Sequence, residues 1–170
     1  MKIEDNFLDQ KEFDKLQNFM MGQQFDWIFT PYILYENDKD KDVKFQLIHV
    51  FYALNAPQSS LIEKLDPILN KINLISLFRI KANLLTRTPN IIENEFHVDM
   101  GGVSKEKLKQ WTTSIFYVNT NNGYTEFEDG TKVESVANRL LSFPANMKHT
   151  GTSCTDKKTR VVINFNYFEQ

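Results

Sequence analysis

The sequence contains one cysteine, Cys154, among 170 residues. No disulfide can form within the chain, so a disulfide-stapled secreted scaffold is excluded. Long apolar runs are also missing, since none approaches the roughly 20 residues that a membrane-spanning helix needs. The first residues, MKIEDNFLDQ, lack the charged-then-apolar order of a signal peptide. We therefore expect a protein of the reducing cytoplasm without a membrane partner.

An excess of charge of one sign is missing too. The 20 basic and 22 acidic residues give a net charge of -2, and no long basic stripe is present that would neutralise a phosphate backbone. A nucleic-acid partner is therefore not expected. Gly and Pro are scarce while 41% of the residues are hydrophobic, which is typical of one globular domain. We expect a single domain over 1–170, acting as a monomer or weak dimer.

Two capping signals predict helices in the N-terminal part. Asp9 is followed three positions later by a glutamate, and apolar residues then recur at helical spacing, which predicts a helix over about 10–21. Ser60 begins the same pattern and predicts a second helix over about 61–71. Between the two, aromatic and β-branched segments at 25–35 and 44–54 predict two strands, joined by a charged loop.

From residue 74 onward the chain consists of short apolar or alternating runs separated by turn residues. Asn122-Gly123 and Asp129-Gly130 are tight-turn signals between the third, fourth and fifth of these runs. The eight predicted strands are 75–87, 94–100, 110–119, 124–128, 131–135, 139–143, 147–152 and 159–168.

This order predicts a mainly β protein with N-terminal helices (α+β). Residues 1–73 would support a core at 74–168, and that core would be a double-stranded β-helix, or cupin-like jelly roll. A seven-stranded immunoglobulin-type sandwich fits the strand count nearly as well. The polar residues favour the jelly roll.

Only three histidines are present, and one of them begins the sequence His97-Val98-Asp99. Residues two apart on a strand face the same side, so His97 and Asp99 can bind one ion, although a surface ion pair explains this pair equally simply. His149 follows on the seventh predicted strand, which a jelly roll brings close to the second. Two imidazoles and one carboxylate form the ligand set of non-haem Fe(II) oxygenases. A structural zinc site would ordinarily need a fourth ligand, and Cys154 falls in the following turn.

Arg160 starts the last predicted strand, whose opposite face is apolar and must be core. A guanidinium on the inward face of a barrel requires a partner, and a bound carboxylate suits its planar fork. The alternative is an Arg160 that reaches water at the strand's edge. Tyr117, on the third predicted strand, can donate its phenol to the same carboxylate or to a backbone carbonyl.

Between about residues 74 and 168 the sequence resembles the 2-oxoglutarate and Fe(II)-dependent dioxygenase superfamily, and within it the prolyl 4-hydroxylase-like branch, including its short phage and bacterial forms. The segments that carry the resemblance are FHVDM, TSIFYVNTNNGYTEFEDG, NRLLSFPANMKHTG and RVVINFNYF.

The resemblance implies roles for six residues. Arg160, Tyr117 and Asn164 would bind the distal carboxylate of 2-oxoglutarate, and the iron ligands would be His97, Asp99 and His149. With O2 as oxidant and ascorbate as a supporting reductant, the enzyme would hydroxylate a C–H bond and release succinate and CO2.

The substrate implied by the resemblance is a prolyl residue of a peptide or protein. The same chemistry on a free amino acid, small metabolite or nucleobase stays open, as does a cupin-like metal-binding module without catalysis.

Three features depart from the family pattern. The tyrosine expected some ten residues before His97 is missing, with Thr86 and Arg87 near its place. The Gly-Gly of the family hairpin is Asn122-Gly123, and Asn166 replaces an expected tryptophan. On the first core strand, Lys81 and Asn83 could contact the substrate or 2-oxoglutarate, although a solvated basic face is the favoured interpretation. The loops at 36–43 and 101–105 are predicted either as lids or as ordinary surface loops.

Overall fold

The computed structural model describes residues 1–34 and 44–169. The predicted charged loop therefore lies outside the described residues. The helices are α1 (Gln10–Met20), α2 (Asp66–Leu69) and α3 (Lys105–Leu108), and a 3-10 helix, η2 (Ser60–Leu65), directly precedes α2. The strands are β1 (Lys2–Glu4), β2 (Ile28–Thr30), β3 (Gln46–Ala53), β4 (Ala56–Pro57), β5 (Leu74–Thr86), β6 (Thr112–Tyr117), β7 (Tyr124–Phe127), β8 (Lys132–Glu134), β9 (Arg139–Pro144), β10 (His149–Gly151) and β11 (Thr159–Glu169).

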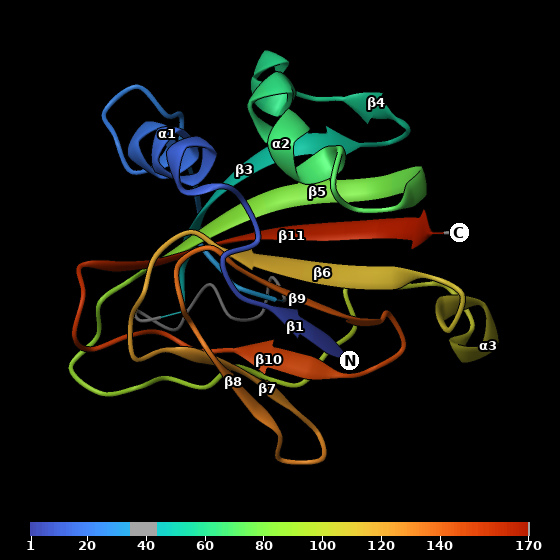
Figure 1. Cartoon of the computed structure of the whole chain (residues 1–170). Helices are drawn as coiled ribbons and strands as arrows, with labels where there is room; N and C mark the ends of the chain where they lie inside the picture. The colour runs from blue at the N-terminus through green and yellow to red at the C-terminus, as the bar shows by residue number, and fades with distance from the viewer. Residues whose placement is uncertain (35–43, 170) are drawn as a thin grey trace.

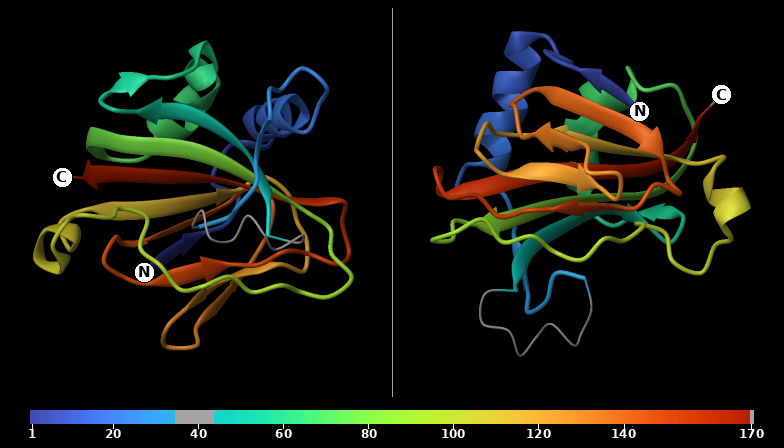
Figure 2. Two further views of the ribbon diagram at one scale, coloured as in Figure 1. Left: turned by 180° about the vertical axis from the view of Figure 1, so that it is seen from behind. Right: turned by 90° about the horizontal axis from the view of Figure 1, so that it is seen from below.

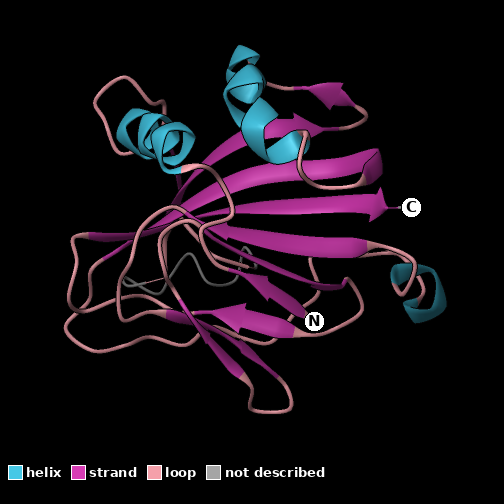
Figure 3. Ribbon diagram, viewed as in Figure 1, coloured by secondary structure: helices cyan, strands magenta, loops and turns pink. Residues whose placement is uncertain are grey.

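The strands form two antiparallel sheets (Figure 1). Within the described residues, the larger sheet has the order β1-β9-β6-β11-β5-β3-β2, with β4 paired to β3, and the smaller has the order β10-β7-β8. The smaller sheet lies across one face of the larger one, as the view from below shows (Figure 2). Helices α1 and α2 cover the opposite face (Figure 3).

Strand alternation gives each face of the larger sheet its own core. Along β11, Val161, Ile163 and Phe165 pack with apolar residues of α1 and α2 in one hydrophobic cluster. Val162 points the other way and packs in a second cluster with Phe127 of β7. The polar members of this second face, which include Arg160 and Asn164, therefore point into the space between the sheets.

The mainly β architecture with antiparallel sheets is consistent with the predicted jelly roll. Seven of the eight strands predicted after residue 74 are present, and the helix at 10–21 is α1. The Asp129-Gly130 turn connects β7 to β8, with Gly130 at a positive φ of 84°. No helix among the described residues is long and apolar enough to cross a membrane.

The strand predicted at 94–100 is wrong. That segment is irregular. Among the described residues it makes one isolated bridge, between His97 and His149, and the preceding Glu93 makes another with Thr152. The Asn122-Gly123 turn is also wrong as a hairpin signal, because β6 and β7 belong to different sheets and this segment crosses between them.

The helix predicted at 61–71 divides into η2 and α2. Pro67 stands in the first turn of α2, where its missing N–H is tolerated, whereas in the middle of one continuous helix its ring would clash with the preceding turn. The cap is Ser59, whose hydroxyl accepts from the Leu61 amide at 3.2 Å, and not Ser60. Asp9 does precede α1, but its side chain makes no capping hydrogen bond.

The N-terminal strands also differ from their predictions. The strand expected at 25–35 is reduced to the three residues of β2, while the one at 44–54 is present as β3. The sequence patterns missed the short elements β1, β4 and α3. The predicted lid at 101–105 leads into α3, and its closure stays a prediction.

Candidate active site

His97, Asp99 and His149 converge at one point, with their potential ligand atoms all within 4.8 Å of one another. The backbone sets this arrangement: the amide of His97 donates to the carbonyl of His149 and the reverse bond is also made, both at 3.0 Å. An isolated bridge to β10, and not a regular strand, thus brings the two imidazoles together. The proximity expected from jelly-roll topology is found, although the predicted local structure at 94–100 is not.

Both imidazoles are oriented by backbone carbonyls. Nδ1 of His97 lies 3.1 Å from the Glu95 carbonyl, and Nδ1 of His149 lies 3.3 Å from the Met147 carbonyl. Because a carbonyl only accepts, each Nδ1 must donate, which leaves the Nε2 lone pair free to bind an ion. Burial lowers the pKa of His149, which favours the neutral imidazole that a metal requires.

The Asp99 carboxylate is braced by two side chains from the larger sheet. Arg79 Nη2 lies 3.2 Å from Oδ1, and Asn166 Nδ2 donates to Oδ2 at 3.0 Å. Asn166 also accepts from Arg79 Nε at 3.1 Å and donates to Thr113 at 3.1 Å. Burial alone raises the pKa of the Asp99 carboxyl, but the two histidines, Arg79 and Asn166 together hold it well below its usual range. The site therefore presents an ionised carboxylate.

Arg160 is 4% exposed and faces the same space between the sheets. Its Nε donates to the Ser135 hydroxyl at 2.9 Å and its Nη2 to the Thr125 hydroxyl at 3.2 Å. Within residues 1–34 and 44–169 no carboxylate pairs with it. Burial lowers the pKa of the guanidinium, so its charge is held at a cost that an anion would offset. The edge-of-strand alternative for Arg160 is wrong.

Tyr117 lies behind Thr125 and does not line the pocket. Its hydroxyl donates to the Thr125 hydroxyl at 2.8 Å, so Thr125 joins Tyr117 to Arg160. Sequence reasoning missed Thr125. Its signal was available, because alternation along β7 places Thr125 on the same inward side as Phe127.

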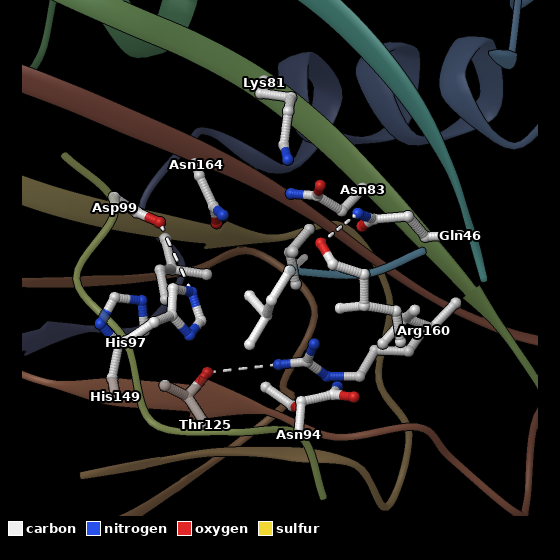
Figure 4. A pocket seen from close by; sticks show the side chains of 16 residues that line it. Gln46, Lys81, Asn83, Asn94, His97, Asp99, Thr125, His149, Arg160 and Asn164 are labelled. Carbon is white, nitrogen blue, oxygen red and sulfur yellow. Dashed lines mark hydrogen bonds and ion pairs between the residues drawn. The ribbon is translucent and has the colours of Figure 1, made fainter. Parts of the chain in front are cut away.

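One pocket, of about 630 Å³ including its open mouth, contains both features (Figure 4). The triad lies on one side of it, Arg160 projects from another, and Lys81 points in from β5. Asn164 also lines it, and Asn164 Oδ1 is buried without a hydrogen-bond partner among the described residues. The favoured interpretation of Lys81 as part of a solvated face is wrong, since its side chain is half-buried in this wall.

The approach of Arg160 to the pocket depends on Gly123. A Cβ at Gly123 would lie 2.7 Å from Arg160 Cδ and 2.6 Å from the Ser153 carbonyl oxygen. The segment that leads into β7 can pass the guanidinium stem only without a side chain. This explains the glycine of Asn122-Gly123 better than a hairpin does, because its φ is not positive.

No family model matches the sequence, and no curated protein matches it. Solved structures do match over nearly the whole chain, and several of them are named as prolyl hydroxylases, as 2-oxoglutarate-dependent, or as having 2-oxoglutarate bound.

A Pseudomonas putida prolyl-4-hydroxylase has a TM-score of 0.62 and 12% identity, covering 99% of this chain and 92% of that one. The epimerase SnoN of nogalamycin biosynthesis has a TM-score of 0.67 and 11% identity, covering 98% and 77%. HygX from Streptomyces hygroscopicus, solved with nickel, 2-oxoglutarate and hygromycin B, has a TM-score of 0.61 and 10% identity, covering 99% and 82%. At these identities the similarity establishes the fold.

Proposed function

We propose that this protein is an Fe(II)- and 2-oxoglutarate-dependent dioxygenase. The observation that carries the proposal is the shared pocket, in which a His-Asp-His triad faces the same space as a buried arginine that has no carboxylate partner among the described residues. A cupin-like metal-binding module would explain the triad but would not explain why Arg160 is buried. The fold that the chain shares with the oxygenase structures supports the same reaction class.

The donor set fits Fe(II). His97, Asp99 and His149 would supply two neutral nitrogens and one carboxylate, the ligand types that non-haem Fe(II) oxygenases use. Iron held there would supply the activation of O2 that couples decarboxylation of 2-oxoglutarate to hydroxylation of a C–H bond. Arg79 and Asn166 keep the Asp99 carboxylate in place, and the two carbonyls fix the imidazole tautomers.

The distal carboxylate of 2-oxoglutarate would pair with Arg160. Ser135 orients the guanidinium from behind, and Thr125, held by Tyr117, presents a hydroxyl beside it. The predicted direct contact of Tyr117 with the carboxylate thus becomes an indirect one. Asn164 supplies a further polar group from the same wall.

A prolyl residue of a peptide or protein is the substrate that the family resemblance favours. The chain shares its fold with a Trichoplax adhaerens prolyl hydroxylase solved with a peptide fragment, at a TM-score of 0.62 and 14% identity. Small molecules accompany other structures of this fold, as HygX shows. A single domain over 1–170, a cytoplasmic location and stimulation by ascorbate stay predictions.

The experiment is a 2-oxoglutarate turnover assay with Arg160→Ala. Hydrogen bonds to charged groups contribute about 1.5–3 kcal/mol, so binding of 2-oxoglutarate should weaken by roughly 10- to 100-fold and succinate formation should fall with it. Arg87→Ala, which removes an exposed arginine, is the matched control. An unchanged dissociation constant in Arg160→Ala would refute the assignment of Arg160.

A further inference from the structure

Lys81 is a pocket residue that the proposed chemistry does not use. It lies on β5 opposite Asn164 of β11, and its ammonium points into the pocket from this wall (Figure 4). Its side chain is half-buried, and within residues 1–34 and 44–169 the ammonium makes no hydrogen bond or ion pair. The ammonium of an ordinary surface lysine extends into water. The position of Lys81 in this wall therefore requires an explanation.

Among the described residues, no carboxylate compensates the charge of Lys81. Asp99 is already paired with Arg79, so within residues 1–34 and 44–169 Lys81 and Arg160 remain as two cations without an anionic partner, to which a divalent metal adds further positive charge. The two carboxylates of 2-oxoglutarate offset Arg160 and part of the metal charge. Even with metal and co-substrate bound, the pocket keeps an excess of positive charge on the side where Lys81 lies.

The protonation state of Lys81 is consistent with a role in binding an anion. Burial is the main cause that lowers its pKa to about 8, and Arg79 lowers it further while Asp99 raises it. At neutral pH the ammonium is thus still mostly charged, although no residue that the structure describes pairs with it. A carboxylate placed beside it would raise the pKa and relieve the cost of burial.

We propose that Lys81 binds a carboxylate of the prime substrate, and that this substrate is a small carboxylic acid such as a free amino acid. The inference rests on the proposed function and replaces the internal prolyl residue with a small acid. Lys81 lies inside the pocket and not on the outer surface, so the acid must enter the cavity that also holds 2-oxoglutarate. Asn164 Oδ1, the unpaired acceptor on the adjacent strand, suits the ammonium of an amino acid.

The test uses nickel(II)-loaded protein saturated with 2-oxoglutarate, so that binding is measured without turnover. Calorimetric titrations compare the free L-amino acids with their carboxamides, and with N-acetylated, C-amidated aspartate and glutamate as probes for an acidic peptide side chain. At least one free acid should bind wild type about 10-fold or more tightly than its carboxamide. Lys81→Met should abolish this preference and change the dissociation constant of 2-oxoglutarate less than about 3-fold, while Lys107→Met, on exposed α3, should keep it.

Several outcomes would overturn the proposal. If the wild type binds no free acid more tightly than its carboxamide, or if Lys81→Met keeps that preference, Lys81 does not bind a substrate carboxylate. A 10-fold or greater loss of 2-oxoglutarate binding in Lys81→Met assigns Lys81 to the co-substrate. Preference for the capped aspartate or glutamate identifies a peptide and removes the small acid. Failure of the wild type to bind 2-oxoglutarate would refute the proposed function as well. The other results would refute only the role of Lys81.

Discussion

Asn166 connects the proposed metal centre to the larger sheet. The sequence showed it only as a departure from the family pattern, but in the structure it contacts Asp99, Arg79 and Thr113 at once. The tryptophan that the family resemblance leads one to expect at this position could not make these three bonds, because an indole is a donor only. No spacing rule could reveal this, because the partners come from β5, β6 and the irregular segment at 94–100.

Asn166→Leu should weaken metal binding by about 10- to 100-fold, the usual effect of removing a residue that orients a ligand. The reason is that the Asp99 carboxylate loses the donor to Oδ2 while Arg79 loses its acceptor. Competition against a chelator measures the affinity for Fe(II). Asn90→Leu, at an exposed position, is the control, and an equal affinity in both variants would contradict the role of Asn166.

Lys81→Met should stabilise the metal-free protein. The folded-state pKa of about 8 lies below the ordinary 10.5, so the folded state binds fewer protons between these values and stability rises with pH across that window. The destabilising effect of the charge is complete below pH 8 and disappears above about 10.5. After discounting for partial exposure, we expect a gain of about 1–2 kcal/mol at pH 7.

Chemical denaturation at pH 7 and at pH 10.5 measures this difference. The gain of Lys81→Met over wild type should shrink at the higher pH, since both side chains are then neutral. A variant that is equally stable or less stable than wild type at pH 7 would show that Lys81 is not held at a cost, and would remove that support for an anion beside it.

At the scale of elements, the irregular segments position the site more than the strands do. His97 and Asp99 were predicted to converge because residues two apart on a strand share a face. They converge because His97 bridges β10 while the chain turns away after it. The two-residue alternation of a strand predicts which residues face the same side. It cannot reveal a segment held by two isolated bridges, because the partner residues lie more than 50 positions further along the chain.

Gly123→Ala tests the crossing from β6 to β7. The added methyl would approach both the Ser153 carbonyl oxygen and Arg160 Cδ more closely than real contacts allow, so the guanidinium must move. We expect 2-oxoglutarate binding to weaken by about 10-fold, because a displaced charged hydrogen bond is largely lost. Gly101→Ala, whose methyl would meet nothing within 4 Å, provides the comparison in the same binding titration. Equal affinities in the two variants would rule out this packing role.

At the scale of the whole molecule, alternation and turn residues predicted a mainly β protein, because the two faces of each strand see different environments. The polar residues then favoured a jelly roll over an immunoglobulin-type sandwich. The triad, Arg160 and Asn164 were singled out from the sequence, and all of them line the pocket. Thr125 and Ser135 were missed because a buried hydroxyl looks the same in the sequence whether it orients an arginine or bonds to backbone. Alternation along β5 places Lys81 on one face of its strand, but it does not reveal whether that face lines a pocket or is exposed to solvent.

We propose that one pocket holds Fe(II) and 2-oxoglutarate together. Anaerobic addition of both to the protein tests it most directly, because iron that chelates 2-oxoglutarate gives a weak visible charge-transfer band. We predict that the wild type shows a saturable band and that Asp99→Ala, which lacks the only carboxylate of the triad, shows none. A wild type without the band, or a band undiminished in Asp99→Ala, would contradict the account.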